Sequence, residues 1–583
     1  MKPTRLLQAV TLATLASFAF AQDDSDGPGR GVARISVING DVSVRRGDSG
    51  DWVAAAINAP LVVQDRLLTG NGSRSEVQFD YANFLRLYAN TEVRFSDLEY
   101  NRYQIQLAGG TITYRVLRDS EADAEISTPS ISIRPVKRGS YRVTVRSDGT
   151  TELSVRSGEV EVFTPRGSER VKSGRTLIAR GSVSDAEFQL VANLPYDDWD
   201  RWNERRDKDL DRSRGYRYAS RSIYGIEDLD PYGDWVYDDP YGYVWVPRVA
   251  VGWSPYRYGR WAWVDWYGWS FVSYDPWGWA PFHYGRWYWG HRGWCWWPGS
   301  IRARYYWSPG LVAFFGWGGG RVGVGFGWGN VGWVPLAPYE PYHRWYGHRY
   351  YGGFRNRNYI DNSVNIVNNV NITNIYRNAR VNNGITAVNG DDFSRGRIHN
   401  LVRASDHDLQ RASLTRGQLP FAPSRDATRL ADREAPVRRT NDGEGRFYSR
   451  RSPSQIERVS FEDQRRGMEE ISRRTFERAR SDISNTGVAD PRRTDADRGA
   501  EGRRGDVRSG DPLTRGGGEA NRGADSTNPG GRRGADTRSA DSVTRSPAAG
   551  PDTSGAISGS GDRRTSSGER ESGAGWRRLG DSR

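Results

Sequence analysis

The sequence predicts a mainly β protein in which a β domain is followed by aromatic β-hairpin repeats and by a long disordered tail with one amphipathic helix. Three observations support this fold class. Apolar and polar residues alternate over short runs between residues 32 and 190, which is typical of half-buried strands. Nineteen of the 23 tryptophans lie between Trp235 and Trp345. The hydrophobic fraction of the chain is 36%, below the ~45–50% of an average soluble domain, so we expect much of the chain not to be conventionally globular.

The first 21 residues are typical of a signal peptide. Lys2 and Arg5 give a positive start, residues 6–21 carry no charge, and Ala19-Phe20-Ala21 is a small-x-small cleavage pattern. Because this stretch is shorter than the ~20 apolar residues that a membrane-spanning helix needs, we expect cleavage rather than anchoring. Gln22 follows in place of a cysteine, which argues against a lipoprotein. The chain is therefore predicted to be exported to the periplasm, the cell envelope or the exterior, with no transmembrane helix after cleavage.

Residues 32–190 are predicted to form one β domain. Asn39-Gly40 lies between two alternating runs and predicts a hairpin, since type I′ turns need positive φ at both central residues. Gly109-Gly110, Ser147-Asp148-Gly149 and Ser157-Gly158 are expected to separate further strands in the same way. The persistent alternation favours sheets with one face in water, and about 150 residues suffice for one core.

Four segments of this β domain resemble the FecR-like domain. They are Leu-Thr-Gly-Asn-Gly-Ser-Arg at 68–74, Leu-Arg-Leu at 85–87, Leu-Ala-Gly-Gly at 107–110 and Leu-Ser-Val-Arg-Ser-Gly-Glu-Val-Glu-Val at 153–162. The resemblance extends from about Arg66 to Phe163 and implies a β fold and an envelope location. The family is named after a periplasmic regulator that passes an outer-membrane transport signal to a sigma factor. That activity uses a cytoplasmic segment and an inner-membrane helix, whereas a predicted signal peptide precedes the β domain here.

After a polar linker at 191–232, residues 233–340 are predicted to form Trp/Tyr-rich β-hairpin repeats. Trp235, Trp261 and Trp287 follow one another at intervals of 26 residues, and each begins a pattern of strand, turn and strand. A fixed period of this length indicates supersecondary units that share one core, because none can bury its own face. The pattern leaves the arrangement of the units open.

The repeats resemble the Tyr/Trp-Gly-Pro-rich repeats that follow FecR-like domains in exported bacterial proteins of unassigned function. The resemblance rests on Asp-Pro-Tyr-Gly-Tyr-Val-Trp-Val-Pro at 239–247, Tyr-Asp-Pro-Trp-Gly-Trp-Ala-Pro at 274–281 and Gly-Trp-Val-Pro-Leu-Ala-Pro at 332–338. It covers approximately residues 230–425. It implies an architecture, but no known ligand.

The repeats contain more aromatic rings than a small hairpin sheet can bury on its own, because both faces or the turn of each hairpin carry rings. One interpretation is that the rings form the core of a thin sheet. The other is that some rings are exposed and, with interleaved arginines, form a platform for an anionic sugar polymer or a protein partner. The candidate binding residues are Trp235, Tyr241, Trp253, Tyr256, Arg260, Trp266, Tyr267, Trp279, Arg286 and Trp287.

The C-terminal part is predicted to contain an Asn-rich segment and extension at 341–424, and then a disordered Arg/Gly/Ser/Asp-rich tail at 425–583. Residues 453–483 carry spaced apolar side chains among charges and predict an amphipathic helix, opened by Ser452 or Ser454. The net charge of +13, mostly from arginine, invites a nucleic-acid interpretation. Acidic residues are mixed with the arginines and the chain is predicted to be exported, so we expect no nucleic-acid partner.

The sequence contains none of the catalytic motifs His-Glu-x-x-His and Gly-x-Ser-x-Gly and no paired cysteines. We therefore predict a protein that is not an enzyme and uses no cofactor. His283, His291 and the single cysteine, Cys295, could approach one another across neighbouring strands and bind a metal. His283 and His291 lie in a linker and a turn, however, where polar residues are expected anyway, so no metal site is predicted.

These features together predict an exported, non-catalytic binding or scaffold protein of the cell envelope, whose aromatic repeat contacts an envelope polysaccharide or a protein partner. The alternative is a FecR-type signal-transduction or sigma-regulatory sensor, as the resemblance implies. A secreted hydrolase is a distant alternative, because no convergent catalytic cluster is visible in the sequence. The identity of the ligand and the oligomeric state are left open.

Overall fold

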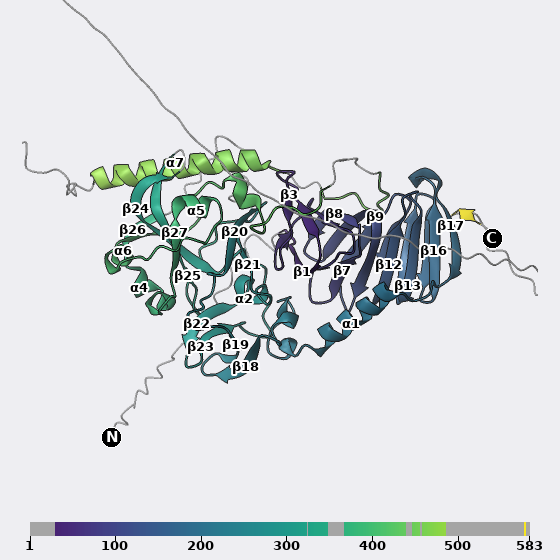
Figure 1. Cartoon of the computed structure of the whole chain (residues 1–583), viewed down its shortest axis with the longest axis horizontal. Coiled ribbons are helices and arrows are strands. Elements are labelled where there is room, and N and C mark those ends of the chain that lie inside the picture. Colours follow the sequence, from purple (N-terminus) through teal and green to yellow (C-terminus); the bar gives the residue numbers. More distant parts are fainter. Residues whose placement is uncertain are drawn as a thin grey trace, which may run out of the picture. The chain divides into compact units, whose positions relative to one another are not determined.

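The computed structural model of the chain describes residues 30–322, 325–347, 366–438, 446–454, 458–485 and 576–578 (Figure 1). All of these residues belong to one compact unit. The structure is mainly β, as the sequence predicts. The predicted signal peptide lies outside the described residues. Within the described ranges, no helix is both long and apolar enough to cross a membrane.

The N-terminal β domain is built from strands β1–β17, to which the short C-terminal strand β29 is added. The strands are β1 Ala33–Asn39, β2 Val42–Arg45, β3 Trp52–Ala54, β4 Pro60–Leu61, β5 Arg66–Thr69, β6 Arg74–Gln78, β7 Asn83–Leu87, β8 Glu92–Glu99, β9 Arg102–Val116, β10 Asp123–Ser127, β11 Ser132–Pro135, β12 Gly139–Val145, β13 Thr151–Ser157, β14 Glu159–Thr164, β15 Gly167–Lys172, β16 Arg175–Arg180, β17 Glu187–Ala192 and β29 Arg577–Arg578.

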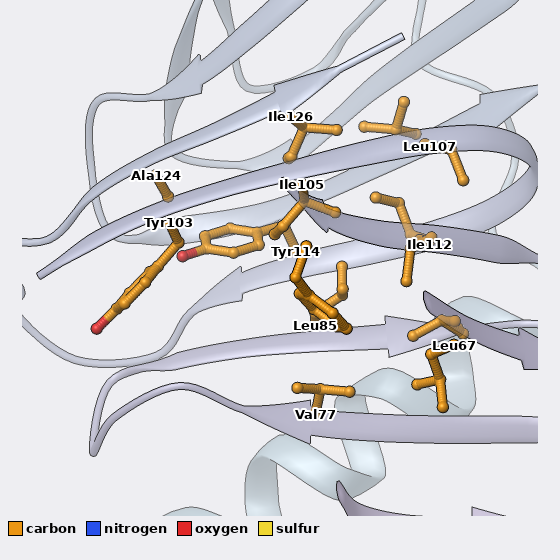
Figure 2. Packing of buried hydrophobic residues seen from close by; sticks show 14 of the residues in the cluster. Leu67, Val77, Leu85, Tyr103, Ile105, Leu107, Ile112, Tyr114, Ala124 and Ile126 are labelled. Atoms are coloured by element: carbon orange, nitrogen blue, oxygen red, sulfur yellow. The ribbon is translucent and has the colours of Figure 1, made fainter. Parts of the chain in front are cut away.

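The long strand β9 belongs to two sheets. Its first half pairs with β8 and its second half with β7 and β12, so the sheet bends between the two halves. Apolar side chains from both sheets then meet in one core (Figure 2). Leu67 from one sheet and Val77 and Leu85 from the other are fully buried in it. The bend thus creates the single core that the alternating pattern predicts.

Several predicted hairpin turns are corners between the two sheets instead. Strands β1 and β2 flank Asn39-Gly40 but pair with different partners, β6 and β5. Ser157-Gly158 separates β13 and β14, which also lie in different sheets. Gly110 has φ +96°, and a Cβ there would lie 2.6 Å from Thr91 Cα. Positive φ redirects a chain at a corner as readily as it closes a hairpin, so the local pattern does not distinguish the two. The turn at Ser147-Asp148-Gly149 does close a hairpin, between β12 and β13.

The predicted polar linker contains a helix, α1 (Asp198–Arg212). Asp197 and Asp200 form a reciprocal capping box at its start. Trp199 is buried, and its indole nitrogen donates to Thr113 Oγ1 at 2.9 Å. Figure 1 shows α1 lying along the β domain near β12 and β13. The sequence pattern does not predict this helix, because the face that contacts the sheet has only a few apolar residues. That face binds the sheet largely through charged side chains.

The aromatic region contains three hairpins at the predicted 26-residue spacing. They are β18 Gly233–Asp238 with β19 Gly242–Pro247, β20 Gly259–Val264 with β21 Gly268–Ser273, and β22 Arg286–Gly290 with β23 Gly293–Trp297. The first and third hairpins join through β19 and β23 into a four-stranded sheet, while the second forms a sheet of its own. Trp235, Trp245, Trp296 and Trp287 lie opposite one another across the four strands. The units therefore share a core without forming a regular stack.

A Gly-rich hairpin and the residues after it form a further sheet. Its strands are β24 Val312–Val322, β25 Gly325–Pro335, β26 Ile366–Val370, β27 Thr386–Asn389 and β28 Ala412–Thr415. The short helices around it are α4 Ile372–Ile375, α5 Gly390–Ser394 and α6 Asp406–Gln410, while α2 Ala280–His283 lies between β21 and β22 in the chain. A Cβ at Gly316 would lie 2.0 Å from the ring of Trp328, so glycine lets this ring lie flat on the neighbouring strand.

The predicted amphipathic helix exists as α7 (Phe461–Asn485), but it begins later than predicted. Ser460 Oγ accepts from the Asp463 amide at 3.2 Å, so Ser460 caps the helix in place of Ser452 or Ser454. The preceding part of the expected disordered tail is also packed: Leu430 is buried, and Arg451 pairs with Asp123 and Glu125 of β10. Ion pairs with residues far away in the chain hold this part of the tail in place, and the composition of the tail alone does not predict such pairs.

Candidate functional site

The structure buries many of the predicted binding residues. Five of the ten are fully or almost fully buried: Tyr256, Arg260, Tyr267, Trp279 and Trp287. The other five are half-buried: Trp235, Tyr241, Trp253, Trp266 and Arg286. The ten residues therefore do not form an exposed platform, and most of the surplus rings belong to the core.

The covering elements come from later in the chain. The ring of Trp261, next to Arg260, meets Phe314 of β24 at 4.9 Å and Trp333 of β25 at 5.8 Å between centroids. Arg260 itself donates to Asp432 at 3.0 Å. A hairpin sheet that cannot bury both faces alone is thus covered by residues 312–335 and by the ordered part of the tail.

The exposed rings of the four-stranded sheet are different residues from those predicted. Tyr237 is 69% exposed, Tyr243 48% and Trp289 54%. Tyr237 and Tyr243 face each other across β18 and β19, with ring centroids 5.6 Å apart in an edge-to-face arrangement. Tyr237 lies two positions after Trp235, on the same face of β18. The 26-residue spacing singled out Trp235, whereas the alternation along β18 places Tyr237 on the same face and carried the signal that was missed.

A cavity of about 590 Å³ lies between the β domain and the aromatic region. Three turns at one end of the β domain form one wall, at residues 79–81, 99–101 and 119–121. Residues 220–224 and 302–307, together with Tyr267 and Tyr284, form the other. The volume is within the range of small-molecule sites, about 300–1,000 Å³. Sequence reasoning missed this site, because its walls come from segments far apart in the chain.

In the wall from the β domain, the carboxylate of Asp80 accepts four hydrogen bonds that hold its turn in place. Asp80 Oδ1 accepts from the amides of Ala82 and Asn83 at 2.7 and 2.8 Å. Asp80 Oδ2 accepts from the Asn83 side chain at 2.8 Å and from the Tyr103 hydroxyl at 2.7 Å. Burial raises the pKa of the Asp80 carboxyl, and these donors oppose the rise. The carboxylate is therefore occupied in shaping the wall.

Tyrosines line the interior and connect the two walls. The Tyr224 hydroxyl donates to the Val32 carbonyl at 2.5 Å, and the Tyr267 hydroxyl donates to the Arg30 carbonyl. Burial raises the pKa of Tyr224 and raises those of Tyr267 and Tyr284 well above the usual value. These three hydroxyls therefore remain protonated donors at physiological pH, and this part of the lining is uncharged aromatic surface.

Charged side chains surround this aromatic interior. Arg221 and Arg304 lie over the rings of Tyr81 and Tyr100, 5.9 and 5.3 Å from the ring centroids, and the neighbouring Arg302 is exposed. Arg302 and Arg304 come from the aromatic region, and Arg221 comes from the segment between α1 and β18. The acidic lining residues come from the β domain and include Glu99, Asp119 and Glu121. The arrangement can bind a ligand that offers flat or apolar faces together with anionic groups.

The residues considered for a metal do not converge. His283 is buried and donates from Nδ1 to the Ser308 carbonyl at 2.7 Å, with its ring stacked on Trp307. Burial lowers the pKa of His283 to about 3, so the imidazole is neutral. His291 is exposed and Cys295 is buried within β23. In the described part of the chain, no group of three or more His, Cys, Asp or Glu residues is placed to hold a metal ion.

The fold and the cavity define a two-part β-rich protein with a ligand-sized space between its parts. Comparison with known families assigns each part. Residues 65–161 match the FecR protein family, so the chain contains a FecR domain, as the resemblance predicts. Residues 226–340 match a family of unknown function (DUF6600), which covers the aromatic hairpins.

Two solved structures are similar to part of the chain. Both are crystal structures of a candidate anti-sigma factor from Parabacteroides distasonis, at 2.50 and 1.65 Å resolution. Each is 21% identical, with a TM-score of 0.20, and the similarity covers 22% of this chain and 59% of the other. No curated protein matches the chain.

Proposed function

We propose that this chain is a non-enzymatic regulatory sensor of the FecR type, exported to the bacterial cell envelope, with the cavity as its ligand site. The observation that supports this most is the FecR match at residues 65–161, because three turns of that domain, 79–81, 99–101 and 119–121, form a wall of the cavity. A ligand held there touches the FecR domain and the aromatic region together. Export is supported by the signal-peptide pattern at residues 1–21.

Ligand binding can act on the contact between the two parts. Asn58 of the FecR side donates to the Asp275 carbonyl at 2.8 Å, and the buried Arg34 pairs with Asp228 at 2.6 Å. A ligand that contacts both walls binds the closed arrangement better than any open one. It therefore shifts the population toward the closed arrangement by its difference in affinity. A population shift of this kind is how we propose that a signal is produced.

The proposed ligand is an anionic glycan of the envelope. Tyr100 and Tyr306 offer ring faces for stacking, with centroids 5.9 Å apart, and Arg302 and Arg304 supply cationic groups beside them. A sugar acid or a phosphorylated sugar presents the matching apolar ring face and negative charge. A protein partner would then receive the signal on another surface.

Transcript profiling of a deletion strain tests the sensor proposal. We expect that loss of the gene changes the expression of a defined set of genes, and that the wild-type chain restores it. The double variant Arg302→Ser/Arg304→Ser should restore it poorly, since both side chains are exposed and their loss spares the fold. Arg248→Ser, which removes an exposed arginine far from the cavity lining, should restore it fully. An unchanged transcriptome would refute the regulatory role.

A second candidate function is an envelope-binding scaffold, and the exposed rings Tyr237, Tyr243 and Trp289 favour it. Exposed aromatic rings on a sheet are suited to stacking on sugars. Co-sedimentation with purified wall polysaccharide tests this candidate. If Tyr237→Ala/Tyr243→Ala no longer sediments with the polysaccharide while Arg302→Ser/Arg304→Ser still does, the sheet is the binding surface. The reverse pattern would assign it to the cavity.

A further inference from the structure

Strand β17 is the last strand of one sheet of the N-terminal β domain before the C-terminal segment. It pairs with β16 along its whole length, from Arg175 opposite Ala192 to Arg180 opposite Glu187. A strand at the end of a sheet presents backbone groups on its other side that another chain can join. Proteins use such edges to bind extended peptides through main-chain hydrogen bonds.

Three residues from the far end of the chain occupy this edge. Arg578 lies opposite Glu187 and Arg577 opposite Phe188, in an antiparallel pairing. Residues 486–575 separate these arginines from α7 along the chain, so the pairing is not the extension of a local hairpin. Figure 1 shows the short strand β29 beside β17, next to the C-terminus.

The side chains of the segment match those of the edge. The guanidinium of Arg180 lies 3.8 Å from the ring centroid of Trp576. Arg578 pairs with Asp185 at 3.0 Å and with Glu187 at 3.6 Å. The segment Trp576-Arg577-Arg578 thus makes a backbone pairing, a cation–π contact and two ion pairs with one edge. The edge and its surroundings therefore contact the side chains of Trp576 and Arg578, whereas Arg577 takes part through its position in the strand pairing.

The contact is also suited to reversal. Both ion pairs are partly exposed, and Trp576 is 39% exposed. Exposed ion pairs and surface cation–π contacts are individually weak and are screened by salt. A two-residue strand and the preceding Trp576, held in this way, can therefore leave the edge without unfolding the β domain.

We propose that the β17 edge is a peptide-docking site whose occupant is the chain's own Trp576-Arg577-Arg578 segment, bound as a detachable strand. The segment covers the edge in the resting protein. A partner peptide of the same chemistry, an aromatic residue followed by two arginines, has to displace it. This inference does not depend on the cavity or its ligand.

Binding of a labelled peptide to the full chain tests the proposal. The peptide spans residues 573–581, and fluorescence anisotropy measures its affinity for the wild type and for Trp576→Ala/Arg578→Glu. We expect at least tenfold tighter binding to the variant, because its own segment no longer occupies the edge. Trp576 is exposed and Arg578 is half-buried at the surface, so neither substitution opens a core and the variant should fold as the wild type does.

A charge reversal provides the matched control. Asp185→Lys/Glu187→Lys, combined with Trp576→Ala/Arg578→Ala so that residue 578 of the tail carries no complementary charge, should abolish binding of the natural peptide and permit binding of a peptide with glutamate at both arginine positions. Hydrogen exchange should show faster exchange around Phe188 in the tail variant Trp576→Ala/Arg578→Glu, with the rest of the β domain unchanged. Equal peptide affinity for the wild type and the tail variant would overturn the proposal. A dimer that forms through Trp576-Arg577-Arg578 and is lost in the tail variant would make a second copy the occupant, and would also overturn it.

Discussion

Glu76 connects the FecR domain to α1, and its removal provides a quantitative test of the packing. Its carboxylate is fully buried and accepts from Arg86 Nε at 2.8 Å and from Arg206 Nη2 of α1 at 3.0 Å. Ser36 Oγ also donates to it at 2.8 Å. Glu76→Gln keeps the shape of the side chain but removes the charge, which leaves two arginine side chains without this partner.

The expected loss follows from the pKa of Glu76. Burial by itself would raise this pKa, but the guanidinium groups of Arg206 and Arg86 outweigh burial and lower it from 4.5 to about 2. Each pKa unit corresponds to about 1.4 kcal/mol, so the ionised carboxylate contributes about 3 kcal/mol of folding free energy at pH 7. A lowered folded-state pKa means that this stability is present above pH 4.5 and is lost as the pH falls toward 2.

Urea unfolding with hydrogen-exchange readout in β6, β7 and β12 measures this contribution. We expect Glu76→Gln to lower the free energy of unfolding of the FecR domain by about 3 kcal/mol at pH 7 and by about 1 kcal/mol at pH 3. Asp198→Asn, which removes a highly exposed carboxylate of α1, should not measurably change the free energy of unfolding. A loss that is equally large at both pH values would show that the charge of Glu76 is not what holds α1.

Three further predictions concern the aromatic region and α7. Trp296→Ala should lower the free energy of unfolding by about 3–5 kcal/mol, because Trp296 is fully buried, whereas exposed Trp289→Ala should cost far less. Ser460→Ala should speed amide exchange in the first turn of α7 and cost about 1 kcal/mol, because it removes the helix cap. Burial raises the pKa of the Cys295 thiol to about 11, so a thiol reagent at pH 8 should react slowly with the folded chain and rapidly in urea.

Each of these outcomes can fail in a distinct way. An equal decrease in the free energy of unfolding in Trp296→Ala and Trp289→Ala would contradict the burial of Trp296 and the exposure of Trp289. Unchanged exchange in Ser460→Ala would place the start of α7 elsewhere, and Ser460→Asp, which retains a capping oxygen, should behave like the wild type. Equal labelling of Cys295 with and without urea would show that β23 does not shield the thiol.

The local features of the fold were predictable because they depend on neighbouring residues. The 26-residue period of Trp235, Trp261 and Trp287 identifies three hairpins, and each forms as predicted. Glycine turns were located correctly but only partly interpreted. Gly40, Gly110 and Gly158 all have positive φ, yet each lies where the chain passes from one sheet to the other.

The candidate site was much less predictable. The tyrosines at 81, 100 and 306 carry no motif, and they line one cavity only because turns of the FecR domain meet segments more than a hundred residues away. The predicted platform of exposed rings was wrong for the same reason, because residues far away in the chain decide which rings are buried. Tyr256 and Trp287 look surplus within one hairpin, but residues from β24, β25 and the following segments cover them.

The sequence by itself determined the strand pattern, the repeat period, the family resemblance and the mainly β class, because turn geometry and side-chain alternation act over a few residues. Only the tertiary structure decided which aromatic rings are exposed to solvent, where the cavity lies and which segment covers the β17 edge. The physical reason is that burial depends on distant partners. The Tyr267 hydroxyl bonds to the Arg30 carbonyl, and Arg578 pairs with Glu187, across separations that no local pattern encodes.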